Sequence, residues 1–199
     1  MNTHAGHDTR THLLATGEQL CMHRGFTAMG LSELLKTAGV PKGSFYHHFP
    51  SKEAFGVFML ERHFSEYHSQ LEAHFHRGAG SYRDRLLGYY QNVLEQFRQQ
   101  GAICACLTVK LSAEVCDLSE AMRQAMEKGA RQIIALLAFS LDEGRKEKSL
   151  TFCGDARSQA QVLYSLWLGA NLQAKICRSP EPLESALAHV EVIIAAPGC

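Results

Sequence analysis

The chain has 199 residues, which is enough for one or two small domains with a sizeable core. Hydrophobic residues make up 46% of it and charged residues 20%, a balance that is typical of folded globular proteins and excludes a disordered chain. The formal net charge is zero, so the whole molecule is not a polycation, and binding to nucleic acid would require segregated charge.

Apolar residues recur at helical spacing along the chain, and no segment alternates with a period of two over a useful length. The sequence therefore predicts an all-α fold of nine helices. We expect them at about 8–24, 31–38, 41–47, 51–76, 82–100, 107–115, 118–145, 155–177 and 182–195. Glycine is unfavourable inside a helix, so Gly17 predicts close packing against a neighbour.

Residues 34–49 organise the rest of the chain. Gly39 can supply the left-handed residue that closes one helix, and Pro41 stands where the next can begin. The second helix places Phe45 and Phe49 on its inner side and polar, cationic and aromatic side chains on its outer side. Two short helices joined by a tight glycine turn predict a helix-turn-helix.

The wider motif runs from Gly25-Phe26 through Ala38-Gly39-Val40-Pro41-Lys42-Gly43-Ser44-Phe45-Tyr46-His47-His48-Phe49 to Ser51-Lys52-Glu53-Ala54-Phe55. It resembles the DNA-binding domain of the TetR family of repressors and covers about the first quarter of the chain. The resemblance implies a helix-turn-helix domain at 1–52, a sensing and dimerisation domain at 53–199, and double-stranded operator DNA as partner. It also implies that Lys42, Tyr46 and Lys52 contact the phosphate backbone of the DNA, and that Pro41, Gly43, Ser44 and His47 lie against the DNA groove.

The charge of the first 52 residues is compatible with that interpretation. Five Lys or Arg side chains stand there against three acids, and six of the eleven histidines lie there too. A modest excess suffices if each of two subunits contributes phosphate contacts to one duplex. Gly30 stands where TetR relatives usually carry a hydroxyl residue, so the phosphate contact of that hydroxyl is not expected here.

The last two expected helices carry broad apolar faces. On one the face comprises Val162, Leu163, Leu166, Trp167 and Ala170, and on the other Leu183, Leu187, Val190 and Ile194. Packing within one chain is one explanation of these faces. We favour a homodimer, because two short recognition helices must read two half-sites one turn apart.

Seven cysteines are many for this length and invite a redox or metal interpretation. Cys106 precedes the expected helix at 107–115, and Lys110 follows one turn later. A helix N-terminus and a nearby cation both lower the pKa of a thiol, which favours the reactive thiolate. The residues alone leave open whether Cys106 is such a nucleophile or the small core hydrophobe that cysteine commonly is.

The segments Cys106–Asp117 and Leu166–Lys175 are similar to one TetR-family member that responds to electrophiles. This similarity implies that Cys106 is a redox sensor with Lys175 as its partner, and that a reactive electrophile or oxidant is the inducer. Cys104 is a possible resolving thiol. Modification would shift the helix at 107–115, which could push the helix at 51–76 and so release the operator.

Three other interpretations remain. Reversible binding of a hydrophobic ligand among the fifth to eighth helices could replace cysteine chemistry. The chain could instead be a cysteine enzyme that consumes electrophiles. Against this interpretation, no histidine lies at a spacing that would mark it as the partner of Cys106. A metal site is disfavoured, because His47 and His48 point about 100° apart on a helix and Cys104 and Cys106 lack a second pair.

No cofactor and no metal are therefore expected. Residues 1–10 are polar and lack the apolar segment of a signal peptide, so we expect a cytoplasmic protein with reduced thiols. The most apolar run, residues 162–176, is too short and too polar to cross a bilayer, so no membrane association is expected.

Overall fold

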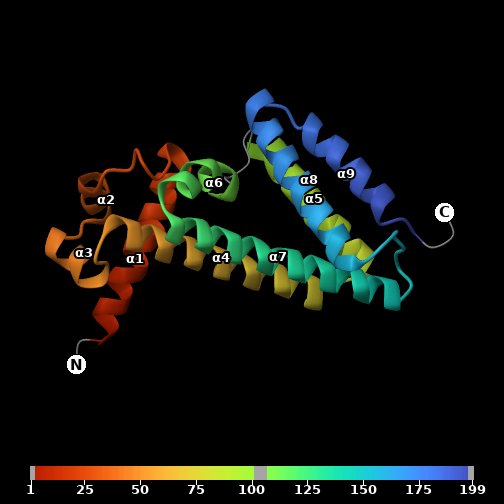
Figure 1. The fold of residues 1–199 in the computed structure, drawn as a ribbon, viewed down its shortest axis with the longest axis horizontal. Coiled ribbons are helices and arrows are strands. Elements are labelled where there is room, and N and C mark those ends of the chain that lie inside the picture. The colour runs from red at the N-terminus through yellow and green to blue at the C-terminus, as the bar shows by residue number, and fades with distance from the viewer. Residues whose placement is uncertain (1–2, 101–106, 197–199) are drawn as a thin grey trace. The chain divides into compact units, whose positions relative to one another are not determined.

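The structure, a computed structural model, describes residues 3–100 and 107–196 (Figure 1). This part of the chain forms nine helices and no strand, which confirms the all-α prediction; Thr151 and Ala195 form only an isolated bridge. The helices are α1 (Thr3–Arg24), α2 (Leu31–Ala38), α3 (Lys42–His48), α4 (Lys52–Arg77), α5 (Tyr82–Gln100), α6 (Leu107–Leu118), α7 (Glu120–Lys146), α8 (Ala156–Cys177) and α9 (Glu181–Ile193).

The helix starts lie within two residues of the sequence prediction except that of α1. Helix α1 begins at Thr3 rather than near Asp8, because no proline interrupts the polar residues that precede Asp8. Helix α3 begins at Lys42, and Pro41 is its extended N-cap, with φ −64° and ψ 148°. The carbonyl of Pro41 accepts hydrogen bonds from the N–H groups of Ser44 and Phe45, so proline still opens the helix from outside it.

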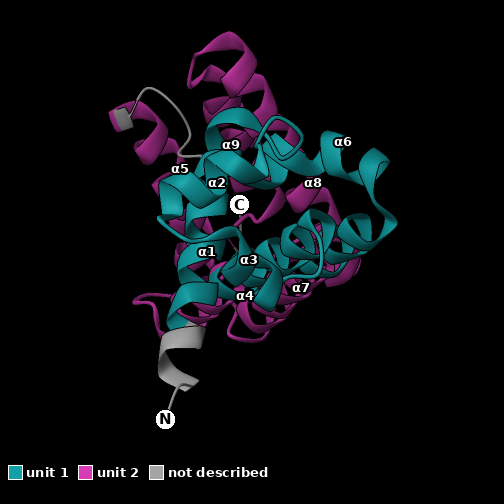
Figure 2. Ribbon diagram, turned by 90° about the vertical axis from the view of Figure 1, so that its left-hand side faces the viewer, with its two compact units in different colours: residues 1–66, 107–129 teal, residues 67–106, 130–199 magenta. Residues whose placement is uncertain are grey.

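The chain divides into two compact units, coloured separately in Figure 2. Unit 1 comprises residues 1–66 and 107–129, and unit 2 comprises residues 67–106 and 130–199. Helices α1–α3, α6 and the first parts of α4 and α7 therefore belong together. The functional boundary expected at residue 52 stays a prediction. The compact unit that contains the helix-turn-helix also includes residues 53–66 and 107–129.

Glycines inside helices let neighbouring elements of unit 1 approach closely. A Cβ atom at Gly17 of α1 would clash with the ring of Phe55 in α4, which confirms the close packing predicted there. A Cβ at Gly129 would clash likewise with the ring of Phe64. Both aromatic side chains are buried, so each ring occupies the space that a larger helical residue would need.

In unit 2, α9 packs against α8 and α5. Tyr90 of α5 and Trp167 of α8 are buried with ring centroids 4.8 Å apart, in an edge-to-face arrangement. Buried Asn171 donates from its side-chain amide to the Trp167 carbonyl at 2.7 Å. The Arg83 guanidinium donates to the Ile194 carbonyl at 2.9 Å, which fixes the end of α9 beside α5.

Candidate DNA interface and sensor region

The turn between α2 and α3 is built by backbone geometry. Gly39 takes the left-handed conformation, with φ 65° and ψ 27°. Its N–H donates to the Lys36 carbonyl and that of Val40 donates to the Leu35 carbonyl, so α2 ends in paired groups. The predicted roles of Gly39 and of the tight turn are confirmed, and the turn fixes where α3 starts.

An aromatic cluster holds α3 from its inner side. Phe45 and Phe49 are fully buried, as predicted, and Phe55 of α4 completes the cluster. The ring centroids of Phe45 and Phe55 are 5.6 Å apart, and those of Phe49 and Phe55 are 5.0 Å apart. These contacts fix the rotation of α3 about its axis and thereby select the side chains that lie outside.

The predicted DNA-contacting residues of α3 lie on its outer side. Pro41, Lys42, Gly43 and His47 are exposed, and Ser44 is half-buried. Tyr46 is 49% exposed, and the Lys42 ammonium lies 5.9 Å from the centroid of its ring. A Cβ at Gly43 would meet no atom within 4 Å, so the backbone is open to an approaching partner there. The structure thus brings these six residues to one short helix and its cap, and their DNA contacts stay a prediction.

Lys52 has partners within the protein. Its ammonium donates to the Phe26 carbonyl at 2.8 Å and to the Thr27 carbonyl at 3.3 Å, and it lies 4.8 Å from the centroid of the Phe26 ring. Lys52 therefore ties the start of α4 to the loop between α1 and α2. Its predicted contact with a phosphate is untested, and any such contact would have to share the ammonium with these carbonyls.

Electrostatics next to α3 favour a neutral imidazole at one of its two histidines. Burial, followed by the neighbouring His47 and Arg10, lowers the pKa of His48 below its ordinary value. The Arg10 guanidinium itself lies over the Phe58 ring, 4.4 Å from the centroid. His48 is therefore neutral at pH 7, whereas Lys42 and Arg10 carry positive charge next to α3.

The cysteines fall into three groups. Cys21 is fully buried, and burial, followed by the charge of Glu114, raises the pKa of its thiol to about 12, so it is no nucleophile at neutral pH. Cys116 is half-buried, and Cys153 and Cys177 are exposed. The predicted sensor Cys106, the possible resolving thiol Cys104 and the last residue, Cys199, lie outside the described residues.

The predicted partner Lys175 is exposed on α8, one turn after buried Asn171. The structure does not test its pairing with Cys106, which stays a prediction. Helix α6 begins at Leu107, so the sequence places Cys106 directly before it. Helix α6 also belongs to the unit that contains the helix-turn-helix.

Sequence reasoning missed the role of Glu114 in α6. Its carboxylate accepts a hydrogen bond from the Phe26 N–H at 3.1 Å and another from the Thr27 N–H. The partners are 88 and 87 residues away along the chain, and no local pattern marks such a contact. Gly25 was the available signal, because a glycine that ends α1 also leaves room for a group beside the backbone.

The expected apolar faces of α8 and α9 are largely covered within the chain. Leu163, Trp167 and Ala170 are buried, and so are Leu183, Val190 and Ile194. Val162 was expected in the same face but is exposed, and it belongs to a second stripe of α8 with the spacing of three and four residues that places side chains on one helical face. It consists of Val162, Ser165, Gly169, Leu172 and Ile176. On α9, Val192 is 71% exposed.

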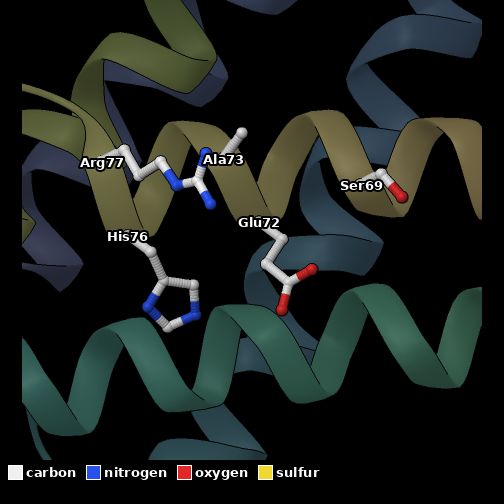
Figure 3. A pocket seen from close by; sticks show the side chains of 5 residues that line it. All are labelled: Ser69, Glu72, Ala73, His76 and Arg77. Atoms are coloured by element: carbon white, nitrogen blue, oxygen red, sulfur yellow. The ribbon is translucent and has the colours of Figure 1, made fainter.

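The hollow that the structure shows on α4 does not resemble an apolar ligand cavity. It measures about 510 Å³ and is lined by Ser69, Glu72, Ala73, His76 and Arg77, which lie along α4 in Figure 3. Each of these residues is exposed, and most are polar or charged. The His76 ring lies 4.9 Å from the Phe139 ring of α7, as expected for a surface contact between neighbouring helices.

One buried polar atom of unit 2 does lack a partner. Among residues 3–100 and 107–196, no group accepts from or donates to the Tyr90 hydroxyl. Burial raises the pKa of Tyr90 well above its ordinary value, so the hydroxyl keeps its proton. No group of three or more His, Cys, Asp or Glu residues in the described ranges could hold a metal ion, and none of the helices formed there is long and apolar enough to cross a membrane.

The short glycine-turned helix pair with a polar outer face defines a helix-turn-helix protein of the DNA-binding class. Comparison with known proteins agrees. The family "Bacterial regulatory proteins, tetR family" matches residues 13–55, and "Tetracyclin repressor-like, C-terminal domain" matches residues 83–190.

Relatives match over nearly the whole chain. NemR, an HTH-type transcriptional repressor of Escherichia coli (strain K12), is 70% identical over 99% of this chain and 99% of its own. DhaR, an HTH-type transcriptional repressor of Mycobacterium sp. (strain GP1), is 32% identical over 91% of this chain and 89% of its own. The crystal structure of the reduced form of E. coli NemR superposes with a TM-score of 0.93 at 69% identity and covers 96% of this chain and 100% of that one.

The chain therefore belongs to the TetR family of bacterial transcriptional regulators. It is a TetR-type repressor and not an enzyme, because its full-length relatives are transcriptional repressors. This confirms the family resemblance and the fold inferred from the sequence.

Proposed function

We propose that the protein is a homodimeric, cytoplasmic repressor that leaves its operator when Cys106 is oxidised or alkylated. The observation that carries this proposal is the 70% identity to NemR over 99% of both chains, combined with the position of Cys106 directly before α6. The relative's crystal structure is described as a reduced form, which supports a redox-sensitive thiol in a protein this similar.

The DNA-binding part of the proposal assigns α3 to the major groove. A short helix fits that groove, which is about 12 Å wide, and presents its outer side chains to base edges. Lys42 and Tyr46 contact phosphates, whereas Pro41, Gly43, Ser44 and His47 lie against the groove. Lys52 contributes by holding the loop between α1 and α2, and it shares its ammonium with a phosphate where the duplex comes close.

Replacing Lys42 tests this assignment. The variant Lys42→Ala loses one phosphate contact per subunit, so its operator affinity falls and the magnitude of its salt slope decreases by about 1 for each lost contact. Fluorescence anisotropy at several salt concentrations measures both quantities. The exposed Lys148, in the turn after α7, provides the matched control Lys148→Ala. Equal salt slopes for the Lys42 variant and the parent would exclude the contact.

The exposed stripe of α8 supports the homodimer. Residues 162, 165, 169, 172 and 176 follow the alternating three- and four-residue spacing of a helix–helix seam. A Cβ atom added at Gly169 would meet no atom within 4 Å, so a neighbouring helix can approach there. Leu172, Ile176 and Val192 are 47%, 67% and 71% exposed, and a second subunit would remove them from water.

The sensing chemistry requires one nucleophilic thiolate. Toward N-ethylmaleimide or a quinone, the Cys106 sulfur forms a bond to one alkene carbon, the C=C π bond breaks, and the other carbon takes a proton from water. Toward a hypochlorite-like oxidant, the thiol is oxidised to a sulfenic acid and the oxidant is reduced to chloride. Aldehydes are a third class of electrophile to which a thiol adds reversibly.

The decisive variant is Cys106→Ser. It is expected to bind operator like the parent but to stay bound after one equivalent of N-ethylmaleimide, whereas the parent is released. Gel shift and mass spectrometry on the same samples report release and adduct position. Cys153→Ser, at an exposed cysteine, is the matched control and should respond like the parent. Release of Cys106→Ser by the reagent would refute the sensing assignment.

The second candidate function is also that of a DNA-binding repressor, but reversible binding of a hydrophobic small molecule, rather than thiol chemistry, releases the operator. The unpartnered Tyr90 hydroxyl beside Trp167 favours it, because a ligand with a carbonyl oxygen would satisfy that buried donor. Non-electrophilic analogues of the inducers separate the candidates. Release of the operator by a saturated analogue that cannot alkylate supports the ligand, and release by the unsaturated compound alone supports Cys106.

A further inference from the structure

The loop between α1 and α2, residues 25–30, is bound from two sides by charged side chains. Glu114 of α6 accepts hydrogen bonds from the N–H groups of Phe26, at 3.1 Å, and of Thr27. Lys52 of α4 donates to the carbonyls of the same two residues, at 2.8 and 3.3 Å. An anion and a cation thus pair with both polar groups of one dipeptide, which is an arrangement of charge-assisted hydrogen bonds.

Gly25 makes room for the carboxylate. Its φ is +87°, in the region that favours glycine, and a Cβ added there would lie 2.7 Å from the Glu114 Oε2 atom. The N–H of Gly25 also donates to the Cys21 carbonyl at 2.8 Å, which closes α1. The backbone at the end of α1 is therefore shaped to receive a group from α6.

A second link joins the end of α6 to the start of α4. Ser119, between α6 and α7, is buried and donates from its hydroxyl to the Glu53 carboxylate. The same hydroxyl accepts from the Met122 N–H at 3.2 Å, so it also caps α7. Glu53 follows Lys52 directly, and the two links therefore meet at the first turn of α4, next to α3.

The Glu114 carboxylate is charged at neutral pH. Burial would raise its pKa, but the hydrogen bonds from Thr27 and Phe26 and the charge of Lys110 lower it below its ordinary value. Lys110 lies one turn earlier on the same helix, toward Cys106. Helix α6 thus carries the cation Lys110 and, one turn later, the anion Glu114, which is hydrogen-bonded to the loop between α1 and α2.

We propose that Glu114 is the positioning residue through which α6 controls the orientation of the helix-turn-helix, with the bond between Ser119 and Glu53 as the second point of control. This inference rests on the proposed sensing at Cys106. Glu114 is seven residues beyond Leu107, the first residue of α6, which is about 10 Å along the helix, and a 12-residue helix transmits a displacement of its first turn as a rigid body.

Displacement of α6 withdraws the carboxylate from the two N–H groups. The loop then loses its partner on one side, while Lys52 still holds its carbonyls on the other. Residues 25–30 lead directly into α2, so their rearrangement changes the position of α2 and of α3, which is joined to α2 by the Gly39 turn. Two discrete states with different operator affinities follow, and this is what allosteric release requires.

The variant Glu114→Gln tests the coupling. Its amide keeps the shape of the side chain and loses the charge. The matched control Asp117→Asn makes the same change at an exposed position of α6. Each protein is treated with one equivalent of N-ethylmaleimide, the adduct at Cys106 is quantified by mass spectrometry, and operator affinity is measured before and after.

The parent and Asp117→Asn should lose operator affinity by a factor in the range of about 5–150 that is common for allosteric coupling. Glu114→Gln should be alkylated at the same rate and yet lose less than about 3-fold. Equal loss in Glu114→Gln and the parent would overturn the inference. No loss in the parent, or full loss in Cys106→Ser, would instead overturn the proposed function, so the two failures are distinguishable.

A measurement on the parent alone makes the test independent of the stability of the variant. Amide hydrogen exchange of Phe26 and Thr27 is compared before and after alkylation. Protection of these two amides should fall by at least about 10-fold in the adduct, because their acceptor has left, while that of α9 amides stays unchanged. Unchanged protection of Phe26 and Thr27 in a protein that has released its operator would overturn the inference, whatever Glu114→Gln does.

Discussion

The two units use their polar and apolar groups differently. In unit 1, side chains from distant helices bind loops and helix starts, as Glu114 and Lys52 do at Phe26 and Thr27. In unit 2, helix α8 leaves an apolar stripe in water, including Ile176 at 67% exposure. The difference is that the polar groups of this loop in unit 1 are paired within the chain, whereas unit 2 leaves an apolar stripe exposed, which is the surface assigned to the proposed dimer.

Charging the stripe of unit 2 is the change with the largest expected effect. Ile176→Lys would bury an ammonium in the proposed interface, so the dimer should dissociate and operator affinity should fall by at least about 10-fold. An added cation can only help non-specific DNA binding, so a loss of affinity reports the dimer. Sedimentation velocity and anisotropy measure both, with Gln132→Lys at an exposed site of α7 as control. A dimer that survives Ile176→Lys would place the interface elsewhere.

Filling a close approach in unit 1 should have the next largest effect. Gly17→Ala places a methyl group against the buried Phe55 ring, and overpacking of this kind costs about 1–3 kcal/mol, less the ~1 kcal/mol that alanine gains in a helix. Urea unfolding measures the difference. Gly43→Ala, where an added Cβ meets nothing within 4 Å, should be neutral or stabilising. A stable Gly17→Ala would mean that α1 and α4 can separate without cost.

The pH dependence of stability tests the charged contact of unit 1. The native pKa of Glu114 is below the ordinary 4.5, so its contribution to the free energy of unfolding is fully present above pH 4.5. It is lost as the pH falls through the native pKa, because the unfolded chain binds a proton first. The stability of Glu114→Gln should therefore fall less steeply than that of the parent below pH 4.5, as urea titrations at each pH would measure. Parallel curves would show that the carboxylate contributes nothing to folding.

The parts of the fold that were predictable from sequence depend on neighbours in the chain. Gly39, Pro41, Phe45 and Phe49 each act within one helical turn, so their spacing alone predicted the turn and the buried side of α3. The clash that Phe55 imposes at Gly17 was predicted from the cost of glycine in a helix, although its partner was not.

The unpredicted parts depend on contacts across the chain. The bonds of Glu114 span 87 and 88 residues and those of Lys52 span 25 and 26, and contacts at such separations have no sequence signature. The apolar face of α8 was predicted from the positions of its apolar residues in the sequence. Which apolar residues α5 and α9 cover could be decided only by the packing of Trp167 and its neighbours.

The smallest expected effect concerns the start of α2, where glycine is the N-cap. Gly30 has φ −75° and ψ 141°, which any L residue adopts, and an added Cβ would meet nothing within 4 Å. Its side-chain cap is absent, so Gly30→Ser should gain a few tenths of a kcal/mol through a new hydrogen bond to the first turn of α2.

Gly30→Ala is the matched control, because it restricts the backbone in the same way without offering an acceptor. Serine is expected to exceed alanine in the free energy of unfolding by about 1 kcal/mol, as serine caps do over alanine in other helices. Urea midpoints at constant m-value measure the difference. Equal stabilities would mean that water already satisfies the N–H groups at the start of α2. The stability of unit 1 would then depend on its long-range hydrogen bonds rather than on the capping of this helix.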